Sequence, residues 1–170
     1  SGLDIADRLL ASFPSMLLYW HRFHESGQRI DVQTDDTSMA GHFLRLLHGR
    51  PGDELELRVM GVSLILYAEH EFNASTFAAR VCASTLSDFY SAMTSAIGTL
   101  RGPLHGGANE WAFELITQFD SPDAAEQGIL ERLAAKEKIM GFGHRVYQDC
   151  DPRSEIIQTW SRRLSNHHAA

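Results

Sequence analysis

Residues 101–109 read Arg-Gly-Pro-Leu-His-Gly-Gly-Ala-Asn, and they separate two stretches with helical periodicity. Pro103 cannot continue a helix that precedes it, because proline lacks an N–H and its ring clashes with the preceding turn. The glycines of the stretch let a ligand approach the main chain closely. A new helical pattern begins at Ala108. We therefore predict a junction between two helices, with one histidine, His105, at its centre.

His105 stands just ahead of the predicted second helix. The positive end of a helix macrodipole disfavours an imidazolium in that position. A neutral imidazole can donate a hydrogen bond to a developing oxyanion instead of only exchanging protons. The loop alone leaves two interpretations open, namely a catalytic histidine or a turn rich in glycine and proline whose histidine is incidental.

Outward from this loop, helical periodicity recurs along the chain, and no segment shows the alternating pattern of a strand. The segments predicted as helices are 3–10, 15–24, 38–47, 55–68, 76–100, 108–119, 122–136 and 154–164. We expect Pro14 to restart a helix, because proline is tolerated in a first turn. Ser121 is the predicted N-cap of the helix that begins at Pro122. The predicted fold class is all-α.

The composition limits the possible partners. The chain has 170 residues with 44% hydrophobic residues, which is enough for one domain with a core, or for one domain and part of another. The net charge of -7 argues against nucleic acid or an anionic membrane as the main partner. Neither a membrane-spanning run nor a signal peptide is recognisable. Cys82 and Cys150 form no CxxC pair, so we expect a reducing, cytoplasmic setting. Residues 167–170 are expected to be a tail or a truncation point.

Three histidines share a setting, because His70, His105 and His144 each lie at a junction between predicted helices. Histidine exchanges protons near neutral pH, and arginine can hold a carboxylate through two parallel hydrogen bonds. Three histidines with Arg153 would suit carbonyl chemistry on a substrate that bears carboxylates. Each histidine alone is better explained as structural. We predict no metal site, because the zincin pattern fails at Ala74.

Four segments together resemble the citrate synthase family. They are His-Glu-Phe-Asn-Ala-Ser-Thr-Phe at 70–77, Gly-Pro-Leu-His-Gly-Gly-Ala-Asn at 102–109, Gly-Phe-Gly-His at 141–144 and Asp-Pro-Arg at 151–153. They occur in the family's order and approximate spacing, and the similarity runs over essentially the whole chain. The sequences of residues 67–73, 34–44 and 46–49 favour the 2-methylcitrate branch of that family.

The resemblance implies condensation of an acyl-CoA with oxaloacetate, followed by hydrolysis of the thioester. His105 would stabilise the enol of the thioester, and His144 would polarise and protonate the ketone of oxaloacetate. The residues that would bind substrate are His70, Asn73, Asn109 and Arg153. The adenine-binding segment of the CoA site would be Ile139, Met140, Gly141, Phe142 and Gly143, with Lys136 and Lys138 as phosphate contacts. No cofactor is expected to be tightly bound, and the acyl-CoA would be a co-substrate.

One departure from the family is large. The family's third catalytic group, a carboxylate base, is expected beyond Ala170. In family terms, residues 1–106 would be part of a large dimer-forming domain and residues 107–170 part of a small CoA-binding domain. We therefore expect a central, inactive fragment of a homodimeric enzyme. Its acyl-CoA would be propionyl-CoA or, as the alternative, acetyl-CoA. A non-catalytic helical module that dimerises or binds CoA is the alternative from another class.

Overall fold

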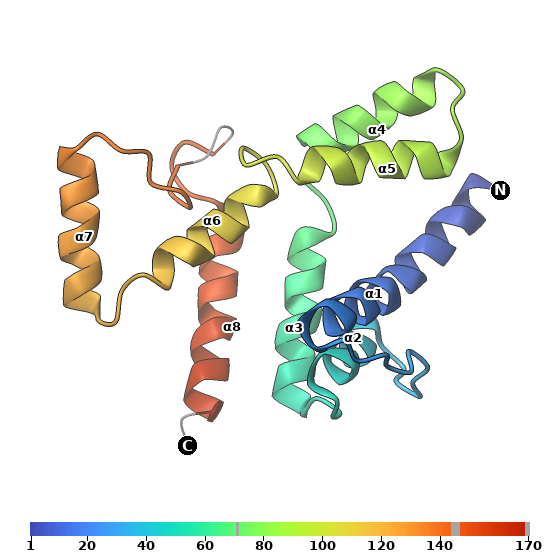
Figure 1. The fold of residues 1–170 in the computed structure, drawn as a ribbon, viewed down its shortest axis with the longest axis horizontal. Coiled ribbons are helices and arrows are strands. Elements are labelled where there is room, and N and C mark those ends of the chain that lie inside the picture. The colour runs from blue at the N-terminus through green and yellow to red at the C-terminus, as the bar shows by residue number, and fades with distance from the viewer. Residues whose placement is uncertain (71, 144–146, 169–170) are drawn as a thin grey trace. The chain divides into compact units, whose positions relative to one another are not determined.

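The computed structural model describes residues 1–70, 72–143 and 147–168. Within these residues the chain forms eight helices and no strand, which confirms the predicted all-α class (Figure 1). The helices are α1 (Gly2–Ser26), α2 (Met39–His48), α3 (Glu54–Tyr67), α4 (Ala74–Ser84), α5 (Phe89–Leu100), α6 (Gly107–Ile116), α7 (Pro122–Ala134) and α8 (Pro152–His168).

The chain divides into two compact units. The first contains Ser1–His70 together with Asp151–Ala170, and the second contains Glu71–Cys150. Helices α1, α2, α3 and α8 therefore belong to the first unit, and α4 to α7 belong to the second. The change of domain expected after residue 106 stays a prediction.

In the first unit, α1 packs on α2, α2 on α3, and α3 on α8. Leu18 of α1 and Leu44 and Leu46 of α2 are buried at these contacts. Helices α3 and α8 are antiparallel, because Asp53 before the start of α3 contacts His167 at the end of α8. His167 and His168 therefore belong to α8, which corrects the prediction of a tail for these two residues.

Helix α1 is continuous through Pro14, which corrects the prediction of a break between two shorter helices. Proline inside a helix removes one backbone hydrogen bond and costs about 3 kcal/mol. Pro14 and Leu18 are both buried, so packing on α2 offsets that cost. The helix ends at Ser26, two residues beyond the predicted end, because Gly27 adopts a left-handed φ of 70° and donates its N–H to the carbonyl of Phe23.

In the second unit, α4 and α5 form an antiparallel hairpin, which corrects the prediction of one long helix over residues 76–100. Thr85 donates its hydroxyl to the carbonyl of Cys82, Leu86 adopts a φ of 63°, and Asp88 caps α5 by accepting from the N–H of Ser91. The apolar spacing continued across this turn because Leu86 is hydrophobic, yet its side chain is 95% exposed.

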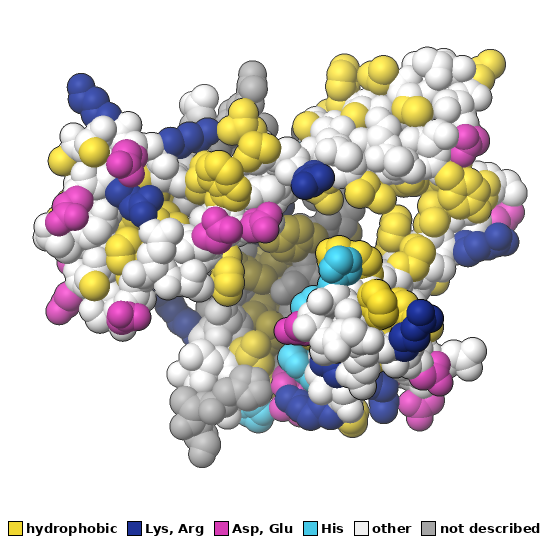
Figure 2. All heavy atoms as spheres, in the orientation of Figure 1, with side chains coloured by type: hydrophobic (Ala, Val, Ile, Leu, Met, Phe, Trp, Pro, Cys, Tyr) yellow, Lys and Arg dark blue, Asp and Glu magenta, His cyan; other side chains and the backbone are white. Residues whose placement is uncertain are grey.

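Large apolar side chains are exposed on both units, as the yellow surface in Figure 2 shows. On the α4–α5 hairpin they include Phe77, Val81, Tyr90 and Ile97. Among the helices that the structure describes, none is both long and apolar enough to cross a membrane.

Candidate functional site

The loop after α5 is closely packed around its glycines. The N–H groups of His105 and Gly107 both donate to the carbonyl of Gly102, at 2.9 and 3.2 Å. A Cβ at Gly107 would lie 2.8 Å from the carbonyl oxygen of Arg101, and one at Gly106 would lie 2.7 Å from the carbonyl oxygen of Leu100. Only glycine fits at these two positions, so the loop holds its histidine in one place. The helix predicted to follow the loop is confirmed as α6.

The imidazole of His105 contacts the first turn of α4. Its Nε2 lies 2.8 Å from the hydroxyl oxygen of Ser75 and 3.3 Å from the backbone nitrogen of Ser75, whose N–H donates to it. Ser75 is the second residue of α4, and first-turn N–H groups have no acceptor within their own helix. The Ser75 hydroxyl also lies 3.0 Å from the carbonyl oxygen of Ala96 on α5. His105 therefore connects its loop to both helices of the hairpin.

The backbone N–H of Ser75 favours one tautomer of His105, in which Nε2 accepts and the single proton of the Ser75 hydroxyl is directed either to Nε2 or to the carbonyl of Ala96. An N–H can donate only to a ring nitrogen that carries no proton, so Nε2 is the acceptor. The proton of the neutral ring then lies on Nδ1, which is left as a donor for a ligand. The imidazole of His105 thus lies against the N-terminal turn of α4. Sequence reasoning missed Ser75. The signal that could have indicated it is Asn73, a typical N-cap residue, which places Ser75 in the first turn of α4.

Two residues predicted to bind the substrate, His70 and Arg153, lie at one end of the α3/α8 pair. His70 lies three residues after Tyr67, the last residue of α3, and Arg153 is the second residue of α8. Because the two helices are antiparallel, the end of α3 and the start of α8 lie at the same end of the pair. The structure therefore brings these two residues to the same region of the first unit.

Arg153 holds the carboxylate of Asp151 in a bidentate pair. Its Nε lies 2.9 Å from Oδ1 and its Nη2 lies 2.6 Å from Oδ2. The backbone N–H of Arg153 also donates to Oδ1, at 2.9 Å. This is the geometry in which a guanidinium recognises a carboxylate of a substrate.

The two predicted asparagines begin helices of the second unit. Asn73 is the N-cap of α4, where its side-chain oxygen accepts from the N–H of Thr76 at 3.0 Å. Asn109 is exposed in the first turn of α6. Substrate binding by either residue stays a prediction.

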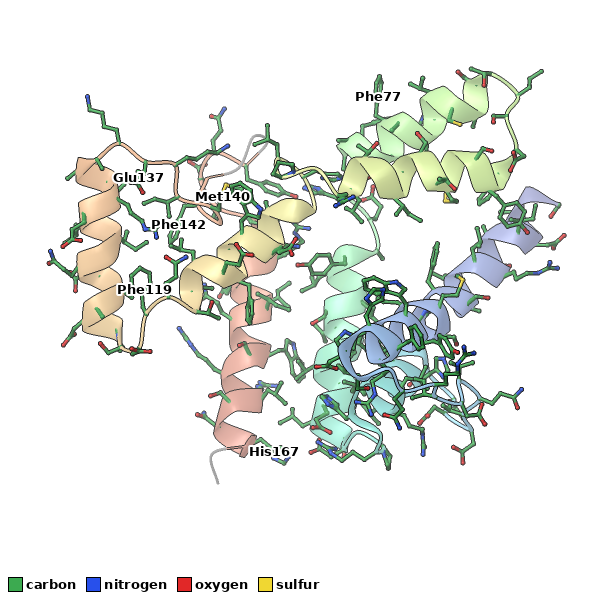
Figure 3. All side chains as sticks on the ribbon, viewed as in Figure 1. Phe77, Phe119, Glu137, Met140, Phe142 and His167 are labelled. Atoms are coloured by element: carbon green, nitrogen blue, oxygen red, sulfur yellow. The ribbon has the colours of Figure 1, made fainter. Side chains whose placement is uncertain are left out.

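The predicted CoA segment is an exposed loop beside α6. Lys136 and Lys138 are exposed, Phe142 is 73% exposed, and Gly141 and Gly143 have φ values of 92° and 80°. A Cβ at Gly141 would lie 3.0 Å from the Cβ of Ala112, so the loop touches the middle of α6. The ring of Phe119, between α6 and α7 in Figure 3, leaves no room for a Cβ at Gly128 of α7. The predicted catalytic His144 lies outside the described residues.

The described residues contain no group of three or more His, Cys, Asp or Glu that could hold a metal ion. Cys82 is half-buried and Cys150 is exposed, and both are free thiols. The chemistry available in the second unit is therefore that of a fixed imidazole, backbone N–H groups and an exposed glycine loop.

Known proteins resemble this chain in sequence and in fold. The family described as citrate synthase, C-terminal domain, matches residues 3–170. The chain is 61% identical to a 2-methylcitrate synthase of Shewanella oneidensis, over 95% of this chain and 43% of that protein. The citrate synthase of Pyrobaculum aerophilum superimposes with a TM-score of 0.87 at 41% identity, over 98% of this chain and 41% of that one.

A second solved structure was determined with ligands. It is the citrate synthase of Thermoplasma acidophilum in a ternary complex with carboxymethyl coenzyme A and oxaloacetate. It superimposes with a TM-score of 0.84 at 36% identity, over 93% of this chain and 42% of that one. The chain thus spans less than half the length of the relatives that it matches.

Proposed function

This chain belongs to the citrate synthase family, whose members condense an acyl-CoA with oxaloacetate, and from that premise we propose that it is part of a 2-methylcitrate synthase that uses propionyl-CoA. The 61% identity to the Shewanella oneidensis protein supports the choice of branch. The observation that carries the proposed chemistry is the N–H of Ser75 donating to Nε2 of His105.

In the proposed reaction, the Nδ1–H of His105 donates a hydrogen bond to the thioester carbonyl oxygen. A carboxylate base, which we place beyond Ala170, removes the α-proton, and the negative charge that develops on the thioester oxygen is stabilised by this hydrogen bond. The α-carbon then attacks the ketone carbon of oxaloacetate, and His144 supplies a proton to the alkoxide oxygen. Water hydrolyses the thioester bond, which releases CoA and 2-methylcitrate.

The remaining assignments follow the family pattern. His70 and Arg153 bind the oxygens of oxaloacetate, and Arg153 has the bidentate geometry that a carboxylate requires. Asn73 and Asn109 support the substrate from the starts of α4 and α6. Residues 139–143 receive the adenine of the acyl-CoA, with Lys136 and Lys138 near its phosphates. No cofactor is tightly bound, and the enzyme acts in the cytoplasm.

The exposed apolar side chains of the α4–α5 hairpin, Phe77, Val81, Tyr90 and Ile97, support a homodimer formed through this hairpin. Burial of such side chains contributes roughly 25 cal/mol per Å² of apolar area. A helical module that dimerises or binds CoA without catalysis is the alternative from another class, and it predicts that the full-length protein shows no CoA release that depends on His105.

The experiment that tests the proposed function measures CoA release by the full-length protein that contains this chain. Oxaloacetate is supplied with propionyl-CoA and, separately, with acetyl-CoA. We expect a higher kcat/KM for propionyl-CoA, by a factor of roughly 10 to 200, because one methylene in a pocket discriminates by about 1–3 kcal/mol. A higher value for acetyl-CoA would instead identify a citrate synthase, and His105→Ala with unchanged turnover would exclude the proposed mechanism.

A further inference from the structure

Polar contacts join α3 to α8 at the end of the pair that is remote from His70 and Arg153. Nε2 of His167 lies 2.8 Å from Oδ2 of Asp53, and Figure 3 labels His167 in the last turn of α8. The guanidinium carbons of Arg58 and Arg163 lie 5.9 and 4.7 Å from the centroid of the Trp160 ring. Cation–π contacts at these distances are attractive. We call Asp53, Arg58, Trp160, Arg163 and His167 the clasp.

Contacts among residues 50–56, none of which involves α8, hold the α3 side of the clasp in place. Asp53 and Glu56 form a capping box, in which each backbone N–H donates to the other's carboxylate at 2.9 Å. Arg50 holds Glu56 through two hydrogen bonds of 2.7 and 2.9 Å. With Oδ1 of Asp53 engaged by the N–H of Glu56, Oδ2 is presented to His167. The N–H of Glu56 and, after it, the imidazole of His167 hold the pKa of the Asp53 carboxyl below its usual range.

The clasp residues of α8 share a face with Arg153. Arg153, Ile157, Trp160, Leu164 and His167 are spaced by four, three, four and three residues, which places them on one side of the helix. Asp53 precedes Tyr67 by the same number of residues as Arg153 precedes His167. At a rise of about 1.5 Å per residue the two segments have the same length, about 21 Å. When the clasp residues are in contact, Arg153 therefore lies beside the C-terminal end of α3, the end that leads to His70.

Apolar burial does little to fix this register. Of the described side chains of α8, none belongs to the buried core, and Glu56 is the buried residue of α3. Apolar packing is non-directional, whereas hydrogen bonds and ring contacts specify which residues meet. The directional contacts of the clasp are therefore the features that define how far α8 is shifted along α3.

We propose that His167 and Trp160 are positioning residues for oxaloacetate binding. They fix α8 against α3 and thereby set the guanidinium of Arg153 relative to His70. The proposal rests on the proposed function, because it takes Arg153 and His70 as the groups that bind oxaloacetate. It adds to that function the requirement that the clasp is intact, although the clasp lies about 20 Å from the substrate at the other end of α3 and α8.

The test uses the full-length protein and steady-state kinetics. We expect His167→Ala and Trp160→Leu to raise the KM for oxaloacetate about tenfold, and to change kcat and the KM for the acyl-CoA less than twofold. His167→Gln retains a donor to Asp53 and should restore most of the wild-type KM. Arg162→Ala is the matched control, since Arg162 is exposed on α8 and is not part of the clasp.

Asp53→Asn provides a second variant if His167→Ala does not fold, because asparagine also caps helices but presents a weaker, uncharged acceptor. We expect it to weaken oxaloacetate binding in calorimetry without acyl-CoA. An unchanged oxaloacetate KM in all three clasp variants overturns the positioning role while the proposed function stands. If the wild-type protein releases no CoA with either thioester, the proposed function fails, and the positioning role falls with it.

Discussion

The two glycine-framed loops of the second unit look alike in sequence but need their glycines for different physical reasons. In the loop of His105, Gly106 has an ordinary φ of -61°, and the space for a Cβ is filled by the side chain and the carbonyl oxygen of Leu100. In the loop of Phe142, Gly143 has open space around it, but its φ of 80° favours glycine. The first loop depends on close packing, and the second depends on backbone angles.

The difference matches the roles proposed for the two loops. A histidine that must present one ring nitrogen to a reacting carbonyl benefits from a loop that cannot shift, since small misplacements reduce catalysis strongly. A segment that lies along a large flexible co-substrate can be exposed, as Phe142 is. The same residue types therefore signal a rigid site in one loop and an open binding surface in the other.

The largest effect is expected from removing the imidazole of the packed loop. His105→Gln should lower kcat about 10³-fold in the full-length protein, because a donor aimed at a developing oxyanion is lost. The KM for oxaloacetate should change little. His48→Ala is the matched control, as His48 is exposed at the end of α2. A fall of less than tenfold for His105→Gln would mean that the packed loop is only structural.

The next largest effect concerns the space around Gly107. Gly107→Ala should destabilise the protein by about 3 kcal/mol, because the added Cβ would lie 2.8 and 2.9 Å from the carbonyl oxygens of Arg101 and Gly102, which cannot move independently. Gly98→Ala is the control, since Gly98 lies in α5 with nothing within 4 Å of an added Cβ. Urea denaturation should show Gly98→Ala at or above wild-type stability. Equal loss in both variants would contradict the packing argument.

The turn between α2 and α3 differs from both glycine-framed loops, because charged side chains stabilise it. In this turn, Arg50 and then the backbone N–H of Asp53, which donates to the Glu56 carboxylate, lower the pKa of Glu56 from 4.5 to about 2. The ionised form is favoured in the folded state, so this stabilisation is present above pH 4.5 and is lost as the pH falls toward 2. Glu56→Gln should cost about 2 kcal/mol at pH 7, the scale of hydrogen bonds to charged groups.

Urea denaturation at pH 7 and at pH 3 measures this contribution. The gap in unfolding free energy between wild type and Glu56→Gln should narrow at pH 3, because the wild type loses part of the advantage of its carboxylate. A gap that widens at the lower pH would show that Glu56 is not stabilised as an anion.

Helical periodicity and cap residues predicted most of the fold correctly, because both act locally. Ser121 is the N-cap of the helix that begins at Pro122, as predicted. The prediction was wrong where tertiary contacts or an exposed apolar residue changed the local signal. Pro14 lies within a continuous helix because its ring is buried, and Leu86 continued the apolar spacing through a turn although its side chain faces solvent.

The site was only partly predictable for the same reason. His105 and its loop were recognisable from glycine, proline and histidine in one short stretch. Ser75 and His167 were not, since each acts through a contact with a residue far away in sequence, His105 and Asp53 respectively. Periodicity carries no information on such pairings.

A smaller effect is expected from Ser75. Ser75→Ala removes the hydroxyl near Nε2 of His105 but keeps the backbone N–H that favours the tautomer with Nε2 as the acceptor. Loss of one hydrogen bond should lower kcat about tenfold. Ser84→Ala, at the exposed end of α4, is the matched control. A loss as large as that of His105→Gln would show that the hydroxyl, and not the backbone N–H, orients the ring.

The smallest effect is expected from Gly143 in the open loop. Gly143→Ala should destabilise the folded loop by about 1 kcal/mol, because a left-handed φ is unfavourable once a Cβ is present. Gly143→Asn should cost less, since asparagine adopts this region more readily than alanine does. Urea denaturation gives the free energies, and the KM for the acyl-CoA reports on the shape of the loop. If Gly143→Ala and Gly143→Asn are equally destabilising, or if either costs as much as Gly107→Ala, then crowding and not backbone angle constrains the open loop. The contrast between the two loops would then be wrong, because no described residue lies within 4 Å of a Cβ at Gly143 to cause such crowding.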